Sequence, residues 1–223
     1  ASLSPDGGVS EVQALVAGKT GGVEAALSHD DRPGVDGADG TIRTLLEQPL
    51  SAESAVRIAL LNNAGLRGSL ATLGVNDALR VQAGTMPNPH FSIGRMRLGD
   101  EVEIERLLSF NLIGLLTLPW KYQWQNQQTE LAKLQAAQDV IRLAANTRKA
   151  WISAVAAQQT AIYMADVKEA AEAGGELARR MARVGNWSKL RQAREQVTLN
   201  DALVQLARSR QAAFAAREKL TRL

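Results

Sequence analysis

The sequence predicts a mainly α-helical protein in which a very long antiparallel, coiled-coil-like helical hairpin follows a single β-hairpin. Three observations support this fold class. After Pro119 the chain runs without glycine or proline as far as Ala173, which is long enough for one uninterrupted helix. A short glycine-containing connection then leads into a second helical segment. Before both, apolar and polar residues alternate over residues 102–112, as is typical of a strand.

Composition narrows the possible functions. Alanine, leucine and valine dominate the apolar residues, and aromatic residues make up only 4% of the 223. Alanine permits close helix packing but buries little area, which favours thin seams over one thick core, so we do not expect an enzyme. The net charge is +3 and charges of both signs are interspersed, which argues against nucleic-acid binding. Cysteine is absent, which excludes disulfides, thiolate metal sites and cysteine nucleophiles.

Residues 1–50 are rich in glycine and aspartate and predict a peripheral strap. A short amphipathic helix is expected over residues 10–17, capped by Ser10, with Val12, Leu15 and Val16 on one face. No run of about 18 apolar residues occurs, so the sequence predicts no transmembrane helix and no intact signal peptide. Only a β-type membrane crossing remains open.

Residues 51–86 predict a helical arm. Ser51 is a suitable cap, and the following apolar residues have helical spacing as far as about Asn63. The region of Gly65 and Gly68 is expected to kink the arm, which then ends near Gly84.

Residues 87–118 predict a β-hairpin. Pro87 and Pro89 stop the arm because proline lacks an amide donor, and the pair Gly99 and Asp100 suits the turn. The alternation of the second strand is broken only at residues 106–107. Its apolar face matches a lipid-facing strand and its polar face a water-filled lumen, although a hairpin packed on a soluble core has the same pattern. The apolar series is Val102, Ile104, Leu108, Phe110 and Leu112.

Residues 119–223 predict the long helical hairpin. Pro119 suits the first turn of a helix that reaches Arg183, and a second helix runs from about Ser188 to the end, which leaves the tip near residues 184–187. Apolar residues spaced by multiples of seven predict the seam between the helices. They are Leu134, Ile141, Val155 and Ile162 in the first helix, and Val197, Val204, Leu199, Leu206 and Leu220 in the second.

This order of parts resembles the TolC-like outer-membrane efflux factor family over residues 50–223. The most specific pieces are residues 50–63 (LSAESAVRIALLNN), 86–89 (MPNP) and 182–185 (ARVG), followed by Ser188 and Leu190. In that family each protomer holds two such repeats, and three protomers close a membrane β-barrel above a periplasmic α-helical tunnel. The resemblance implies that this chain is the first repeat, with its β-hairpin contributing to the barrel of the intact trimer. Many members carry a lipid on an amino-terminal cysteine, which the residues Ala1 to Ser4 are suited to follow.

The resemblance implies an outer-membrane channel component of a tripartite efflux system that exports small solutes such as drugs, metals or other toxic compounds. Most of the chain would be periplasmic. The implied partners are a periplasmic adaptor (membrane fusion) protein, an inner-membrane transporter acting indirectly, outer-membrane lipid and two further copies in a homotrimer. The alternative is a soluble periplasmic adaptor or scaffold whose helical hairpin docks partners.

The resemblance places adaptor docking at the tip. The expected set is Arg183, Val184, Gly185, Ser188 and Leu190, while Asn186 and Trp187 depart from the usual family pattern. Gly185 suits the positive-φ position that ends a helix and Ser188 suits the next cap, so both also have purely local roles. Arg183 adds a donor-rich side chain for carbonyls or carboxylates. The other charges of residues 168–183 are expected to form a solvated face with ion pairs.

Further side chains follow the second strand. Trp120, Tyr122 and Trp124 are candidates for the membrane interface, with packing between neighbouring helices as the alternative. A soft-metal site at Met86, His90 and Met96 is not expected, because His90 and Met96 would lie about 20 Å apart on an extended strand. The glutamates at 101, 103 and 105 have no partner base or nucleophile, so neither catalysis nor a cofactor is expected.

Overall fold

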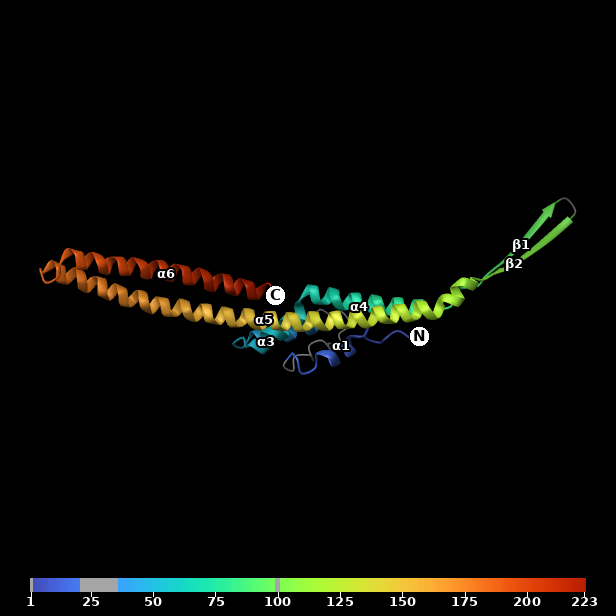
Figure 1. The fold of residues 1–223 in the computed structure, drawn as a ribbon, viewed down its shortest axis with the longest axis horizontal. Coiled ribbons are helices and arrows are strands. Elements are labelled where there is room, and N and C mark those ends of the chain that lie inside the picture. Colours follow the sequence, from blue (N-terminus) through green and yellow to red (C-terminus); the bar gives the residue numbers. More distant parts are fainter. Residues whose placement is uncertain (1, 21–35, 99–100) are drawn as a thin grey trace. The chain divides into compact units, whose positions relative to one another are not determined.

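The computed structural model describes residues 2–20, 36–98 and 101–223, which form six helices and one two-stranded antiparallel sheet (Figure 1). This confirms the mainly helical fold with a β-hairpin. The chain divides into two compact units, one of residues 1–30 with 63–141 and the other of residues 31–62 with 142–223. The elements are α1 (Val9–Val16), α2 (Asp36–Leu46), α3 (Ala52–Asn62), α4 (Ala64–Ala83), β1 (His90–Leu98), β2 (Glu101–Ser109), α5 (Leu112–Arg183) and α6 (Lys189–Thr221).

In the first unit, α4 packs antiparallel on the beginning of α5. The Ser69 hydroxyl donates to the Asp139 carboxylate at 2.7 Å, and the Thr129 hydroxyl donates to the Asn76 carbonyl at 3.3 Å. The later residue of α4 thus pairs with the earlier residue of α5, which shows that the two helices are antiparallel. The buried apolar residues of this seam are Leu66, Leu73, Ala136, Ala137 and Val140.

The arm breaks at Asn63, before the glycines at which the sequence predicts a kink. The backbone of Asn63 is extended, and its side-chain oxygen accepts from the Leu66 amide at 2.9 Å, so Asn63 caps α4. Gly65 and Gly68 lie inside α4 rather than at a kink. The expected arm is therefore two helices, α3 and α4, which belong to different units.

The strap contains α1 in nearly the expected place. Ser10 is not its cap: the Asp6 carboxylate accepts from the amides of Gly8 at 3.1 Å and Ser10 at 2.6 Å. An acidic side chain before the helix satisfies two amides at once, which a serine inside the first turn cannot do. Val12 and Val16 are buried as expected, whereas Leu15 is exposed.

The β-hairpin is shorter than expected. β1 pairs with β2 in a register that runs from His90 opposite Ser109 to Leu98 opposite Glu101, while the predicted turn at residues 99–100 lies outside the described residues. The next pair would place Pro89 opposite Phe110, and proline has no amide with which to extend the ladder. Residues 112–118, which we had assigned to the hairpin, form the beginning of α5 instead.

α5 therefore starts before Pro119 and carries that proline inside it. Asn111 caps the new start, because its side-chain oxygen accepts from the Gly114 amide at 2.7 Å. An internal proline removes one helical hydrogen bond, here the one to the Leu115 carbonyl, but seven residues of helix already precede it. Pro119 suits the first turn of a helix, but the helix begins seven residues before it, at Leu112.

In the second unit, α6 packs antiparallel on the later part of α5. A Cβ at Gly174 would lie near Glu195 and one at Gly175 near Leu199, while Ala161 and Ala213 line the same groove farther along. The α5 side of the seam consists of small residues, with Gly175, Ala161 and Ala178 buried. α6 contributes Leu206, Ala202 and Ser209.

This packing corrects part of the predicted seam. Leu206 is buried and Leu199 lies against Gly175, as predicted, while Ile141 and Leu220 are half-buried. Leu134, Val155, Val197 and Val204 are exposed, and Ile162 lines the groove between α5 and α6 but is also largely exposed. Small residues on α5 allow α6 to approach closely, while Val155 and much of Ile162 stay open to solvent. Heptad spacing alone does not distinguish the two stripes of one helix.

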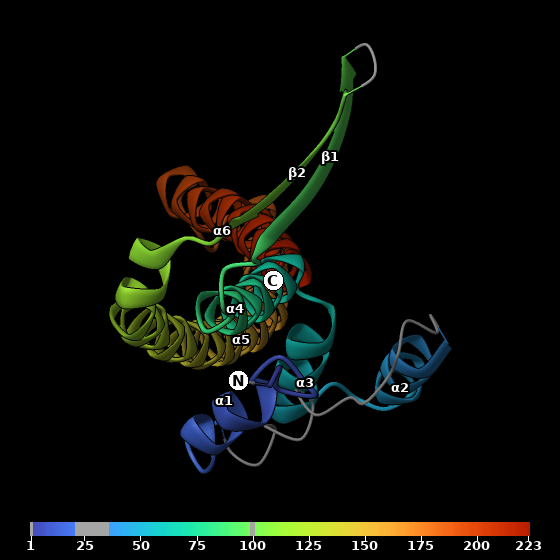
Figure 2. The ribbon, with the colours of Figure 1, turned by 90° about the vertical axis from the view of Figure 1, so that its right-hand side faces the viewer.

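α3 completes the second unit. The Trp151 indole donates to the Leu50 carbonyl at 2.9 Å, just before the α3 cap, where the Ser51 hydroxyl accepts from the Ser54 amide at 3.0 Å. α2 contacts α3, and Figure 2 shows the two helices as neighbours joined by the connecting chain. The buried face of α3 is Ala55, Val56, Ala59 and Leu60.

Candidate functional site

The tip between α5 and α6 is a tightly hydrogen-bonded turn. Gly185 has φ +79°, its amide donates to the Ala182 carbonyl at 3.2 Å, and the Asn186 amide donates to the Met181 carbonyl at 3.0 Å. This is the Schellman arrangement, in which a glycine takes the left-handed position after the helix. The Ser188 hydroxyl accepts from the Arg191 amide at 3.2 Å and caps α6. Gly185 and Ser188 thus have the local roles that the sequence predicts.

Two residues outside the expected set brace this turn. The Arg191 guanidinium lies 3.8 Å from the centroid of the Trp187 ring, and Trp187 is half-buried. Such a cation–π contact holds the first turn of α6 against the tip. Trp187 lies outside α6, just before its cap Ser188, so no helical spacing in the sequence links it to Arg191.

The remaining members of the predicted docking set point to solvent. Arg183 is exposed, and Val184 and Leu190 are 66% and 64% exposed. Apolar side chains this open, on a turn whose backbone is already satisfied internally, are available to a partner. The tip therefore brings together a rigid turn, one arginine and two apolar contacts.

A carboxylate anchors the basic side of the tip. Glu176 accepts from Arg180 Nε at 2.8 Å and from Arg179 Nη1 at 3.0 Å. The hydrogen bond from Arg180 has the largest effect on the pKa of Glu176 and lowers it, and the positive charges of Arg179 and Arg183 lower it further. The ion pairs expected for residues 168–183 are thus present as far as Arg180.

The aromatic candidates are not all on one face. Trp120 and Trp124 are 71% and 64% exposed and line one shallow pocket beside Ala83. Tyr122 is half-buried on another side of α5, next to the Arg80 side chain. The structure therefore joins the two tryptophans and separates Tyr122 from them.

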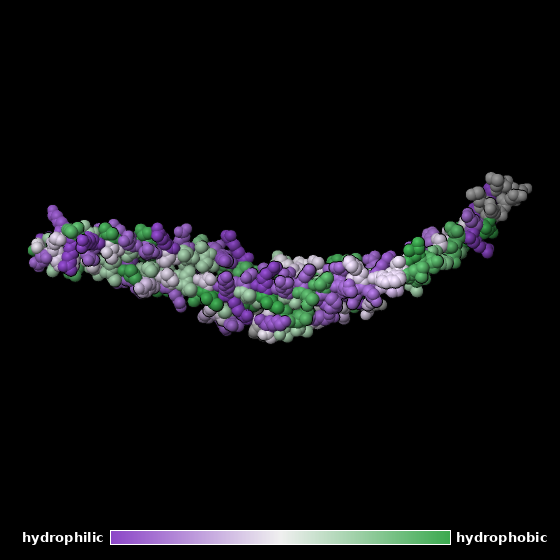
Figure 3. All heavy atoms as spheres, viewed as in Figure 1, coloured by the Kyte–Doolittle hydropathy of each residue, from purple (hydrophilic) through white to green (hydrophobic). Residues whose placement is uncertain are grey.

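An apolar segment precedes these tryptophans. No charged residue occurs between Arg106 and Lys121. Figure 3 shows apolar side chains gathered where α5 begins. A helical turn that is apolar on all sides is typical of an apolar environment rather than of water. The sequence analysis instead predicts part of this segment as strand. Its exposed residues are Phe110, Leu112, Ile113, Leu115 and Leu116.

The register of the β-hairpin gives its faces different chemistry. Directly opposed residues share a face, so Phe91, Leu108, Ile93 and Ile104 fall on one side and Glu105 falls on the other. The apolar face is not purely apolar, since it also carries the exposed side chains of Arg95, Arg97 and Arg106. The break that the sequence shows at residues 106–107 thus places a cation on the apolar face.

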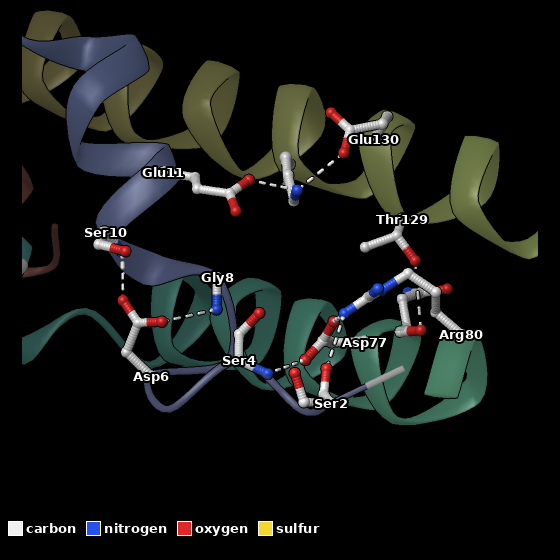
Figure 4. A network of polar contacts seen from close by, with 12 residues as sticks. Ser2, Ser4, Asp6, Gly8, Ser10, Glu11, Asp77, Arg80, Thr129 and Glu130 are labelled. Carbon is white, nitrogen blue, oxygen red and sulfur yellow. Dashed lines mark hydrogen bonds and ion pairs between the residues drawn. The ribbon is translucent and has the colours of Figure 1, made fainter. Parts of the chain in front are cut away.

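A second polar cluster fastens the strap to α4 (Figure 4). Asp77 is 2% exposed and accepts from the Ser4 amide at 2.8 Å and from Arg80 at 2.7 and 3.0 Å. Arg80 also donates to the Ser2 carbonyl at 3.2 Å. Burial raises the pKa of Asp77, but the hydrogen bonds from Ser4 and Arg80 outweigh it, and the net pKa is lowered.

A lysine ties the strap to α5. Lys133 forms ion pairs with Glu11 of α1 and, at 2.7 Å, with Glu130 of its own helix. Burial lowers the pKa of Lys133, but its hydrogen bonds to Glu11 and Glu130 reverse this, and the pKa is raised. Asp77, Arg80 and Lys133 are all satisfied by structural partners, so we assign this cluster to fold stability.

In the part of the chain that the structure describes, no three histidine, aspartate or glutamate side chains gather to hold a metal ion. Met86 and His90 are exposed, while the side chains of Met96, Glu101 and Glu103 lie outside the described residues. None of the described helices has the length and apolar character of a membrane-spanning helix.

Models of known protein families and curated proteins were both compared with the chain, and neither gives a match.

Proposed function

We propose that the chain is the amino-terminal repeat of an outer-membrane channel component of the TolC-like type, which exports small solutes within a tripartite efflux system. The observation that carries the proposal is α5, a single helix of 72 residues that begins beside an exposed β-hairpin and ends in a capped tip. At 1.5 Å per residue its length corresponds to about 108 Å, far beyond a globular helix. A tunnel across the periplasm requires helices of this kind.

The β-hairpin supports a membrane role. Its two strands have nine residues each, and a membrane β-strand needs about 9–11. Two isolated strands leave their outer edges unpaired, which lipid does not tolerate, so the hairpin would need strands from the second repeat and from two further protomers to close a barrel. The uncharged segment before Lys121 and the exposed Trp120 and Trp124 are suited to the contact with outer-membrane lipid.

The outward apolar stripe supports assembly with further helices. Leu134, Val155 and Ile162 on α5, and Val197 and Val204 on α6, are exposed. A homotrimer with two repeats per protomer would cover them and build the tunnel wall. Most of the chain would then be periplasmic.

Docking belongs to the tip in this proposal. Arg183, Val184, Gly185, Ser188 and Leu190 would meet a periplasmic adaptor, through which an inner-membrane transporter supplies the energy. The channel itself performs no chemistry on the solute. A lipid anchor on an amino-terminal cysteine is part of the same proposal.

The second candidate is a soluble periplasmic adaptor or scaffold that uses the same tip. One observation favours it: Arg106, three residues before the end of β2 at Ser109, lies on the apolar face opposite Ile93. An arginine that faces lipid costs about 2–4 kcal/mol at the bilayer midplane and much less near the interface. A hairpin packed on protein would avoid this cost.

Membrane fractionation of the full-length protein that contains this chain separates the two candidates. The channel proposal expects sedimentation with outer membranes, resistance to high salt, release by detergent, and ion conductance when the released trimer is added to a planar bilayer. Release by salt alone, or a detergent-released protein without conductance, would contradict the channel. A matched variant with Trp120→Ala and Trp124→Ala should show weaker membrane retention than one with Trp151→Ala, since Trp151 lies within the second unit.

A further inference from the structure

The tip concentrates positive charge to a degree that the rest of the chain does not. Residues 177–194 contain six basic residues and no acidic one, although the whole chain carries only +3. The remainder is therefore net negative, and the excess of cations is a local feature of this turn. The six residues are Arg179, Arg180, Arg183, Lys189, Arg191 and Arg194.

Little of this charge is neutralised within the hairpin. Glu176 pairs with Arg179 and Arg180 and is a single carboxylate between two guanidinium groups. Arg191 covers the Trp187 ring, an aromatic contact that leaves its charge in place. The other three, Arg183, Lys189 and Arg194, are exposed at the end of α5 and in the first two turns of α6.

The helix dipole also favours an anion at the amino terminus of α6. The amino terminus of α6 carries a partial positive charge, which is unfavourable beside Lys189 and Arg191 and favourable beside an acidic group. No acidic residue occupies the first turn of α6. An external carboxylate near Ser188 would therefore meet cations and the positive helix end together.

Two apolar side chains distinguish the partner from a simple polyanion. Val184 follows Arg183 and Leu190 lies between Lys189 and Arg191 in the sequence, and the two apolar side chains are 66% and 64% exposed. A phosphate backbone offers them nothing to pack against, whereas a protein surface can provide an apolar depression rimmed by carboxylates. A bilayer is also disfavoured, because Trp187, the ring best suited to headgroups, is half-buried under Arg191.

We propose that residues 177–194 dock on an acidic protein surface, in which carboxylates surround a small apolar depression that receives Val184 and Leu190. The inference rests on the docking role proposed above for the tip and adds the chemistry of the partner. Electrostatic attraction of this kind speeds association and weakens as salt rises.

The test uses the full chain and two labelled helical peptides of equal length, both with two leucines on one face, flanked by glutamates in one and by glutamines in the other. Fluorescence anisotropy should show binding of the glutamate peptide that falls with salt and exceeds binding of the glutamine peptide. Arg183→Glu combined with Lys189→Glu should weaken binding of the glutamate peptide about tenfold, since each exposed ion pair contributes modestly.

Neutral and distant variants keep the result interpretable. Arg183→Gln with Lys189→Gln should weaken binding by about threefold with less risk to the fold, which circular dichroism checks. Arg208→Glu with Arg217→Glu changes exposed cations of α6 outside the tip and should leave binding unchanged. Equal binding of both peptides, or equal loss in the distant variant, would overturn the proposal.

Two further arms examine other anions and separate this inference from the channel proposal. If a single-stranded oligonucleotide, or vesicles containing phosphatidylglycerol, bound through Arg183 and Lys189 more tightly than the glutamate peptide does, the proposal of a protein partner would be overturned. If the full-length protein conducts ions but its tip does not bind the glutamate peptide, this inference is refuted and the channel proposal is not. A salt-extracted protein whose tip binds the glutamate peptide would refute the channel alone.

Discussion

Replacing Asp77 with alanine should release the strap from α4 while leaving the helices in place. Asp77 is almost completely buried and joins two elements far apart in the sequence, because it accepts from the Ser4 amide and from the Arg80 guanidinium. Alanine removes the acceptor for both. The Arg80 guanidinium, which is itself mostly buried, then lacks its carboxylate.

The expected cost is about 3 kcal/mol. Breaking a buried ion pair by removing one partner costs about 3–5 kcal/mol, and the lower end applies because Arg80 keeps its bond to the Ser2 carbonyl and some contact with water. Asp77→Asn keeps an acceptor of the same size but loses the charge, so its cost should be about 1 kcal/mol, the difference between a charged and a neutral hydrogen bond.

Hydrogen exchange measures this directly. The amides of Gly7 and Val9 donate to carbonyls within the strap and report its opening. If the strap opens locally, a loss of about 3 kcal/mol speeds their exchange roughly a hundredfold in Asp77→Ala, and the asparagine variant gives about fivefold. Unchanged exchange in Asp77→Ala, or equal effects of the two variants, would show that the charge of Asp77 does not hold the strap.

Four further outcomes are expected. The lowered pKa of Asp77 means that its contribution to stability is complete above the ordinary value of 3.8 and is lost as pH falls below that value. The Gly7 and Val9 amides, corrected for their intrinsic exchange rates, should therefore lose protection only in strong acid, and loss of protection near pH 6 would contradict this. Gly175→Ala should raise the free energy of unfolding by about 0.5–1 kcal/mol in urea titrations, because alanine favours the helix and its Cβ would lie 3.6 Å from Leu199 Cδ2, an ordinary contact; a loss of stability would mean that the seam is tighter than this distance implies. Arg183→Ala in the full-length protein should weaken adaptor binding and export without affecting trimer assembly, as pull-down and efflux assays can measure; if both are unchanged, the assignment of Arg183 to docking is wrong. The 223-residue chain alone should self-associate through its exposed apolar stripe, and a stable monomer in light scattering would count against that stripe as an assembly surface.

The sequence predicts elements well where local chemistry decides alone. The end of α5 at Arg183 and the cap at Ser188 follow from one glycine and one hydroxyl, and both are found as expected. The beginning of α5 was missed because two local signals compete there. Alternation continues to Leu112, but Pro89 ends the ladder on the opposite strand, and this pairing is visible only in the register.

Packing between helices is harder to predict because one helix can carry two apolar stripes. The heptad of Val155 and Ile162 has larger side chains than the stripe of Ala161, Gly175 and Ala178, so area alone favours it as the seam. The observed seam nevertheless uses the small residues, because they let α6 approach closely enough for Leu199 and Leu206 to pack against α5. The strap cluster was out of reach for a different reason: Ser4 and Asp77 are 73 positions apart, and no local pattern links them.

The chemistry of α5 changes along its length, and the proposed channel would account for both of its ends. Its first turns have no charged residue, and its last turns belong to a segment with no acidic one. A scaffold needs only the basic end, since docking explains the cations but gives no reason to expose Phe110, Ile113 and Leu116 to water. Such exposure is costly unless lipid or other subunits cover it, at about 25 cal/mol for each Å² of apolar surface. A helix that begins in an apolar medium and ends at an acidic protein, as we propose for α5, would account for both features, and a trans-envelope channel places its helices in this way.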